Sequence, residues 1–238
     1  MSNSVIIVGA SSGIGEALAR RFAESGYEVG MTARRLERLQ SIGDELPTRT
    51  YVAGMDVTET ETARDTFEDL VDSMEGVDIV VVSAGIAPAN KDLEWEIEED
   101  TIETNVSGFV ALATAAVNVF EEQGHGHLVG ISSVSAHVGL KEVPAYSASK
   151  AFVSRYLEAL RFRTKVRDAD VTVTTIEPGY VDTKLSLGGL WETTPEVAAG
   201  QIFDAVEKGR KRVYVTRRWR LVVWLMTLFP EAIKRRLV

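Results

Sequence analysis

The chain has 238 residues and a formal net charge of −9, and hydrophobic residues make up 45% of it. This length fits one large α/β domain, and the negative charge argues against general binding to nucleic acid phosphates. Cysteine is absent and histidine occurs three times, so we expect no disulfide framework, no thiol nucleophile and no metal site.

Short apolar runs alternate with amphipathic segments along the chain. We expect strands over residues 5–8, 27–32, 50–53, 77–82, 127–131, 171–176 and 212–215. We expect helices over residues 14–24, 36–46, 59–74, 99–122, 145–167 and 195–208. Gly26 and Pro47 would end the first two helices. Apolar strands that alternate with helices predict a seven-stranded parallel sheet with helices on both faces.

Nothing in the sequence marks a linker or a second domain. We therefore expect a single domain over residues 1–238, with residues 217–238 as an apolar and basic extension. The N-terminus leads directly into a strand without the pattern of a signal peptide, which predicts a cytoplasmic protein. His125 and His127 flank Gly126 just before a predicted strand, and this pattern favours a surface turn over a pair of metal ligands.

A glycine-rich turn occupies residues 8–15, between the first predicted strand and helix. Glycines let the backbone approach a pyrophosphate, and a helix N-terminus offers free N–H groups and a positive dipole end. The spacing is Gly-x-x-x-Gly-x-Gly rather than the general Gly-x-Gly-x-x-Gly. Its place after the first strand of an α/β chain predicts a dinucleotide site.

Tyr146 and Lys150 stand four residues apart in a predicted helix, so they project from the same face. A phenol has a reference pKa of about 10, and a neighbouring ammonium group favours the phenolate. The pair is therefore a candidate acid/base, and with the glycine turn it indicates hydride transfer.

These motifs and several others, in this order, resemble the short-chain dehydrogenase/reductase family over nearly the whole chain. The matching segments are residues 8–15, with Val8 where the family has Thr, then Asp56-Val57, Asn105, Ser133, Tyr146 with Lys150, and the Pro-Gly-x-Val-x-Thr of residues 178–183. The resemblance implies a Rossmann-type doubly wound fold. It also implies an oxidoreductase acting on a small carbonyl or alcohol, in which Asn105, Ser133, Tyr146 and Lys150 are catalytic.

The resemblance assigns a role to each catalytic residue. Tyr146 would protonate the carbonyl oxygen, and Ser133 would orient and polarise the carbonyl. Lys150 would lower the pKa of Tyr146 and bind the nicotinamide ribose. Asn105 would hold a water that links Lys150 to solvent.

The resemblance further implies a set of cofactor-binding residues. They are Gly9, Ser11, Ser12, Gly13, Ile14, Gly15, Arg34, Arg35, Asp56, Val57, Ser83, Ala84, Gly85, Asn105, Tyr146, Lys150, Pro178, Gly179, Val181 and Thr183. One segment departs from the family, because Val82-Ser83-Ala84-Gly85 stands where Asn-Asn-Ala-Gly is common. Ser83 would replace part of what the missing amides do.

The end of the second predicted strand indicates the coenzyme. An acidic residue there would hold the ribose 2′-OH of NAD, whereas arginine suits the 2′-phosphate of NADP. The sequence has Arg34 and Arg35 and no acid, so we expect NADP(H), with NAD(H) as the alternative. Residues 185–194 would close over the substrate, and His137 would face solvent rather than the substrate pocket.

The C-terminal segment has an apolar stretch over residues 221–229 between basic groups, too short to span a bilayer. We expect it to form a subunit contact of a homodimer or homotetramer, or to cover the substrate pocket. Peripheral membrane contact through residues 217–238 is the alternative. Two other functions are a non-catalytic nucleotide sensor, which the four catalytic residues argue against, and an epimerase or dehydratase, for which the chain lacks a substrate domain.

Overall fold

A computed structural model describes residues 3–167, 170–183 and 191–230 of the chain. Within these residues seven strands form one sheet in the order β3-β2-β1-β4-β5-β6-β7. All six strand pairs are parallel. The strands are β1 (Ser4–Val8), β2 (Glu28–Ala33), β3 (Thr50–Gly54), β4 (Ile79–Val82), β5 (His125–Ile131), β6 (Asp170–Pro178) and β7 (Arg212–Val215). The predicted doubly wound α/β fold is confirmed.

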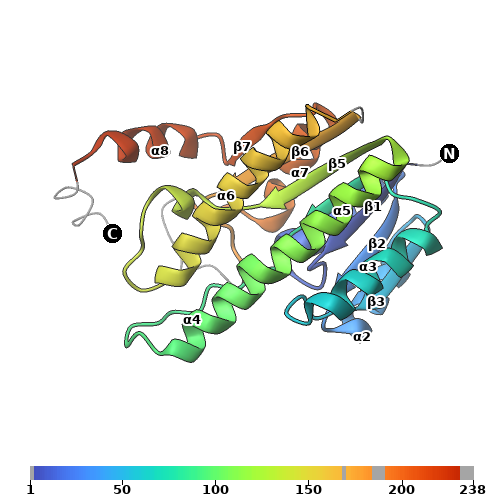
Figure 1. Cartoon of the computed structure of the whole chain (residues 1–238), viewed down its shortest axis with the longest axis horizontal. Coiled ribbons are helices and arrows are strands. Elements are labelled where there is room, and N and C mark those ends of the chain that lie inside the picture. The colour runs from blue at the N-terminus through green and yellow to red at the C-terminus, as the bar shows by residue number, and fades with distance from the viewer. Residues whose placement is uncertain (1–2, 168–169, 184–190, 231–238) are drawn as a thin grey trace.

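Helices cover both faces of the sheet (Figure 1). They are α1 (Gly13–Glu24), α2 (Leu36–Glu45), α3 (Thr60–Ser73), α4 (Trp95–Ile102), α5 (Phe109–Gln123), α6 (Pro144–Thr164), α7 (Pro195–Glu207) and α8 (Trp219–Leu228). Side chains of a strand alternate between faces, so Val5 and Ile7 of β1 pack with α1, α2 and α7, while Ile6 and Val8 pack with α3, α5 and α6. This double burial explains why the strands read as continuous apolar runs.

The strand order reverses direction at β1, which lies between β2 and β4. In such sheets, ligands bind outside the carboxyl ends of the strands at this switch point. The loops that follow β1 and β4 approach closely here, since a Cβ on Gly9 would lie 2.6 Å from the backbone nitrogen of Ala84. Only glycine allows that approach, so the sequence itself shapes the crevice.

The helix predicted over residues 99–122 is longer than expected. It runs from Trp95 to Gln123 and contains a π-helical segment, η1 (Glu103–Gly108), between α4 and α5. A π-helical turn closes its hydrogen bonds at i→i+5, which periodicity in the sequence does not reveal.

The surface turn expected at His125 and His127 was wrong, because β5 already begins at His125. His127 is half-buried within the strand, and its Nε2 lies 2.8 Å from Oγ1 of Thr174 on β6. Gly126 lets the strand pass under α5, because a Cβ at this position would overlap the Phe120 ring.

The helix α8 lies at the end of the molecule beside β7 (Figure 1). Trp219, its first residue, is buried and packs on the Gly179 backbone, with edge contacts to the rings of Tyr180 and Trp191. Trp219 also lines the main cavity, which fits the alternative that the C-terminal segment covers the substrate pocket. Residues 231–238, and residues 184–190 of the expected substrate loop, lie outside the described residues.

Candidate active site

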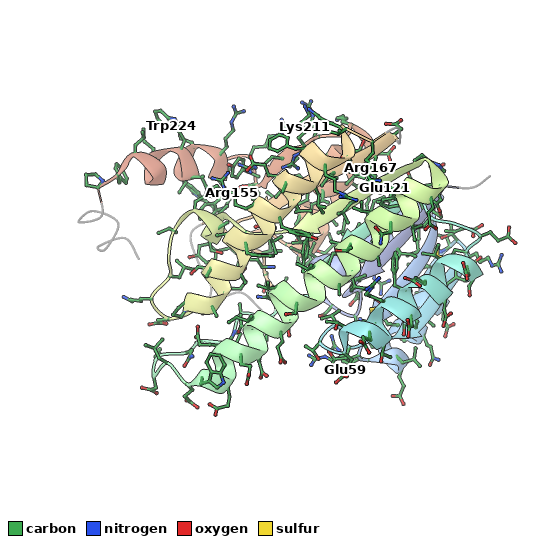
Figure 2. The ribbon with its side chains drawn as sticks, viewed as in Figure 1. Glu59, Glu121, Arg155, Arg167, Lys211 and Trp224 are labelled. Carbon is green, nitrogen blue, oxygen red and sulfur yellow. The ribbon has the colours of Figure 1, made fainter. Side chains whose placement is uncertain are left out.

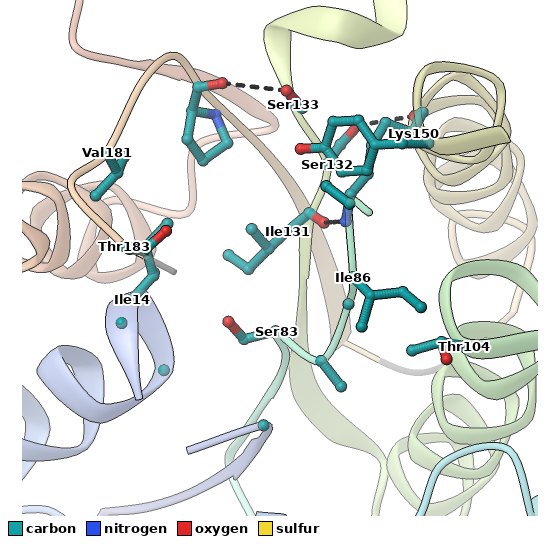
Figure 3. Close-up of a pocket in the computed structure, with 18 of the residues that line it drawn as sticks. Ile14, Ser83, Ile86, Thr104, Ile131, Ser132, Ser133, Lys150, Val181 and Thr183 are labelled. Atoms are coloured by element: carbon teal, nitrogen blue, oxygen red, sulfur yellow. Dashed lines mark hydrogen bonds between the residues drawn. The ribbon is translucent and has the colours of Figure 1, made fainter. Parts of the chain in front are cut away.

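A cavity of about 520 Å³ opens along the carboxyl ends of the central strands (Figure 3). Of the residues predicted to bind the cofactor or to act in catalysis, all except Asn105 line it. The view in Figure 3 places Lys150 and Ser133 on one side of the cavity and Ile14 and Thr183 on the other. The fold therefore brings together predicted residues that are up to 174 positions apart, as Gly9 and Thr183 are.

The glycine turn forms one end of the cavity. Gly9 and Gly13 have φ values of +89° and +58°, and a Cβ on Gly15 would overlap the carbonyl oxygen of Gly9. Ser12 stands at the N-cap of α1, yet its side chain makes no capping hydrogen bond, so the N–H groups of the first turn face the cavity without that partner. These features fit a pyrophosphate bound at the helix N-terminus.

Two arginines at the end of β2 lie beside this cradle and behave differently. Nη2 of Arg35 donates hydrogen bonds to the carbonyl oxygen of Ser11 (3.1 Å) and to its Oγ (2.9 Å), which holds the guanidinium across the glycine turn. The Arg34 side chain is 71% exposed, and its Nη1 lies 3.9 Å from Oδ2 of Asp56. Both line the cavity, so this end carries positive charge in an otherwise acidic protein.

Tyr146 lies on the first turn of α6 and lines the cavity, and its hydroxyl is hydrogen-bonded with Ser133 and Ser135. Burial raises the pKa of Tyr146, and hydrogen bonds with Ser133 and Ser135 lower it in part. The phenol is therefore protonated at neutral pH. The expected lowering by Lys150 is not what the geometry shows, because the Lys150 Nζ lies 5.7 Å from the ring centre and donates to a backbone carbonyl instead.

Lys150 is buried beneath the cavity one turn further along α6. Its Nζ donates to the carbonyl oxygen of Ile131 at 3.0 Å (Figure 3). Burial lowers the pKa of Lys150 to about 8, so the amine is mostly cationic at neutral pH and loses its charge easily above it. The absence of a side chain at Gly85 leaves room for Nζ, since a Cβ there would lie 3.3 Å from it.

Asn105 does not line the cavity but holds its wall in place. Its Oδ1 accepts a hydrogen bond from the Ile86 N–H, and its Nδ2 donates to the Ile86 carbonyl, both at 2.8 Å. Nδ2 also donates to Oγ of Ser149 on α6 at 3.1 Å. Asn105 lies in the π-helical segment, and it joins the loop after β4 to the helix that carries Tyr146 and Lys150. The structure thus gives it a positioning contact that the sequence did not predict.

Ser133 and Ser132 follow β5 and point in different directions. Ser133 caps the short 3-10 helix η2 (Val134–His137), where its Oγ accepts from the Ser135 N–H at 3.1 Å, and it lies 3.5 Å from the Pro178 carbonyl oxygen. Oγ of Ser132 donates to the Lys150 carbonyl and lies 2.8 Å from Oγ of Ser154. Both serines line the cavity, and Ser132 in addition anchors α6.

His137 does not face solvent as expected. Its Nε2 lies 2.8 Å from Oε2 of Glu177, a fully buried carboxylate that also accepts from Ser154 at 3.0 Å and has Nε of Arg212 at 3.6 Å. Glu177 precedes the Pro178-Gly179 segment of the cavity. The sequence could not reveal this cluster, because its members come from η2, α6, β6 and β7.

The cavity also has an apolar end that sequence reasoning largely missed. Its walls there are Val138, Leu140, Val143, Tyr180 and Trp219. Trp219 belongs to the apolar C-terminal segment, which was the one available signal. The described part of the chain contains no cluster of three or more histidine, aspartate or glutamate side chains that could hold a metal.

The chain is similar in sequence to known oxidoreductases. A family model for short chain dehydrogenases matches residues 3–188. The chain is 37% identical over 230 residues to an uncharacterized oxidoreductase of Myxococcus xanthus (92% of this chain, 89% of the other). It is 36% identical over 181 residues to an NADP-dependent 3-hydroxy acid dehydrogenase of Escherichia coli (74% and 72%).

The fold is also similar to that of a solved dehydrogenase structure. Serine dehydrogenase from Escherichia coli superposes with a TM-score of 0.78 at 31% identity, covering 89% of this chain and 96% of that one. The family match covers well over half of the chain, and the cradle and the Tyr146–Lys150 pair lie in one cavity. The chain therefore belongs to the short-chain dehydrogenase family and is a nicotinamide-dependent oxidoreductase.

Proposed function

We propose that this enzyme interconverts a carbonyl compound and the corresponding secondary alcohol with NADP(H), and that Tyr146 is its general acid and base. The observation that carries the proposal is the shared cavity, in which Tyr146, Ser133 and Lys150 stand opposite the glycine cradle. A non-catalytic nucleotide sensor would have no need of a buried lysine beneath a buried tyrosine.

The chain's own residues would hold the coenzyme in two places. The N–H groups at the start of α1 would bind the pyrophosphate, and Arg34 with Arg35 would bind the 2′-phosphate. Lys150 would contact the nicotinamide ribose. NADPH, when bound, supplies the hydride. The printed name of the Escherichia coli relative, which is NADP-dependent, supports the same preference.

The proton comes from Tyr146. In reduction its O–H bond breaks as a new O–H bond forms on the carbonyl oxygen, which leaves a phenolate on the enzyme. Ser133 donates a hydrogen bond to the same oxygen and stabilises the charge that develops there. Lys150, cationic at neutral pH with a pKa of about 8, offsets the charge of the phenolate. In alcohol oxidation the phenolate takes the proton back.

The apolar end of the cavity supports a substrate whose reacting carbonyl carries an apolar group. Apart from Lys150 and the two arginines at the coenzyme end, the described lining of the cavity has no lysine or arginine to pair with a substrate carboxylate. We expect a higher kcat/KM for an uncharged ketone than for a 3-oxo acid of the same length, and the reverse order would contradict this assignment.

Replacing Tyr146 with Phe tests the mechanism. Tyr146→Phe removes only the hydroxyl, so turnover should fall by about 10²–10⁴-fold while the Kd for NADPH stays within about twofold. Tyr156→Phe is the matched control, because Tyr156 is on the same helix and its hydroxyl contacts Thr114 outside the cavity. Near-wild-type turnover in Tyr146→Phe, measured with excess NADPH, would refute the assignment.

A further inference from the structure

The helix α8 has two apolar stripes, and only one of them is buried. Trp219 and Val223 face the body of the protein. Leu221, Trp224, Leu225 and Leu228 are 61%, 58%, 38% and 63% exposed, and they recur at the spacing i, i+3, i+4 and i+7. That spacing places them along one side of a helix. Figure 2 labels Trp224 on α8 at the edge of the molecule, and the same residue also lines a groove with Tyr214 of the body.

Positive charge accompanies this exposed stripe. Arg217, Arg218 and Arg220 are exposed at the start of α8, and no acidic residue occurs between residues 217 and 230. Residues 217–238 contain six basic residues and one acidic residue, a net charge of +5, whereas the whole chain carries −9. The remainder of the protein therefore carries −14, and the charge is strongly segregated to the C-terminal segment.

A groove runs beside the same helix. It is lined by His137 and Tyr214 on the body of the protein and by Arg217, Arg220 and Leu221 among the residues of the C-terminal segment. Two guanidinium groups thus stand next to apolar side chains. This combination suits a phosphate that is attached to hydrocarbon, because arginine binds phosphate through paired N–H donors.

The dimensions of α8 indicate what kind of partner could cover its exposed apolar stripe. A stripe of ten residues is about 15 Å long and roughly 10 Å wide, so it covers about 150 Å². A stable protein interface needs about 800 Å² on each partner, which makes a second copy of the chain a poor match for this stripe alone. The helix is also far too short to cross a hydrocarbon core of about 30 Å.

Elsewhere among the described residues, the helix over Trp95–Gln123 is long and apolar enough, by length and composition only, to cross a membrane. Its most apolar stretch is 44% buried, and the helix packs on α3, α6 and the sheet. That helix therefore belongs to the core, and the exposed apolar surface of α8 is a separate feature.

We propose that α8 is an interfacial helix, which lies in the surface of a membrane containing anionic phospholipids. Leu221, Trp224, Leu225 and Leu228 would enter the boundary between headgroups and acyl chains. The arginines would bind the lipid phosphates, with one headgroup in the groove between α8 and Tyr214. Helices that combine basic residues with tryptophan and leucine bind membranes in this way.

The test uses the full-length protein and vesicles of phosphatidylcholine with or without phosphatidylglycerol. We expect cosedimentation with the anionic vesicles, at least about tenfold weaker binding to the neutral ones, and loss of binding in high salt. The double variant Trp224→Gln/Leu228→Gln should bind the anionic vesicles at least about tenfold more weakly.

A matched control removes an equivalent apolar pair elsewhere. Leu93 and Trp95 are 67% and 61% exposed near the start of α4, so Leu93→Gln/Trp95→Gln should leave vesicle binding unchanged. Thermal unfolding and NADPH binding verify that both double variants are folded.

Three results would overturn the proposal. The first is wild-type protein that does not sediment with anionic vesicles, and the second is an equal loss of binding in the control variant. The third is a change in oligomer size, measured by light scattering, in Trp224→Gln/Leu228→Gln without a change in vesicle binding. That result would assign the stripe to a second copy of the chain.

Discussion

Lys150 is a cationic side chain held in the protein interior, with the Ile131 carbonyl as its hydrogen-bond acceptor. Burial lowers its pKa from 10.5 to about 8, so the folded state disfavours the charged form. Between pH 8 and 10.5 the unfolded chain binds more protons at this residue than the folded one. The free energy of unfolding therefore rises with pH through this window, and below pH 8 the full cost of burial remains.

Replacing Lys150 with Met should stabilise the protein at neutral pH even though it removes turnover. The gain should be on the order of 1 kcal/mol at pH 7, because the desolvation cost of the ammonium disappears but the Ile131 carbonyl loses its donor. Urea unfolding at pH 7 and pH 10 checks the sign, since only the wild type should gain stability from Lys150 between them. A variant less stable than wild type at pH 7 would contradict the argument.

Variants of the two arginines at the end of β2 should affect coenzyme binding in different ways. Arg34 is exposed, and its Nη1 lies 3.9 Å from Oδ2 of Asp56. Since its proposed role is to bind the 2′-phosphate, Arg34→Ala should weaken NADPH binding by about 1.5–3 kcal/mol and leave NADH binding nearly unchanged. Arg35 holds Ser11 of the glycine turn, so Arg35→Ala should weaken both coenzymes. Calorimetric titration of both coenzymes distinguishes the two cases, and an NADH preference in the wild type would overturn the coenzyme assignment.

Most of the predicted residues that line the cavity could be identified in the sequence because their signatures are local. Tyr146 and Lys150 are one helical turn apart, and the glycine turn is continuous in sequence. The pair formed by His137 and Glu177 could not be predicted, because 40 residues separate them and each looks ordinary in its own segment. The clamp between Asn105 and Ile86 escaped prediction for the same reason.

Among the elements, the central strands followed from their apolar runs because they are buried on both faces. The ends of the helices and strands could not be predicted from the sequence, since they depend on contacts with other elements. The strand β5 starts at His125, and Gly126 allows this start because a Cβ there would overlap Phe120 of α5. The π-helical segment at Asn105 likewise lacks a sequence signal, whereas the surrounding helix has one.

His127, the half-buried histidine of β5, should make the fold sensitive to acid. Burial lowers the pKa of His127 from 6.5 to about 4, so the unfolded state binds the extra proton between these values. The free energy of unfolding should therefore fall by up to roughly 3 kcal/mol through this residue as the pH falls from about 6.5 to about 4. His127→Gln should flatten this part of the pH profile in urea unfolding. His125→Gln is the control, because its side chain is 59% exposed, and an equal effect from it would contradict the assignment.

In the whole molecule, the coenzyme site is lined by segments that come from most parts of the sheet and from the helices that cover it. Its lining comes from the loops after β1, β2 and β3 on one side and from β5, α6 and β6 on the other. The segment after β6 and the start of α8 close the apolar end, where Trp219 packs on Gly179. A ligand that contacts all of these binds the folded state and not the unfolded chain.

NADPH should therefore raise the free energy of unfolding, by an amount set by the logarithm of its concentration relative to its Kd. At a concentration 100 times its Kd, a ligand specific to the folded state adds about 2.7 kcal/mol to the free energy of unfolding. For a chain of this size that raises the Tm by roughly 5–10 °C. NADH at the same concentration should give a smaller shift, because it lacks the phosphate that Arg34 and Arg35 would bind. In Arg34→Ala the shift with NADPH should fall towards that with NADH, whereas equal shifts for both coenzymes in the wild type would show that the arginines do not select between them.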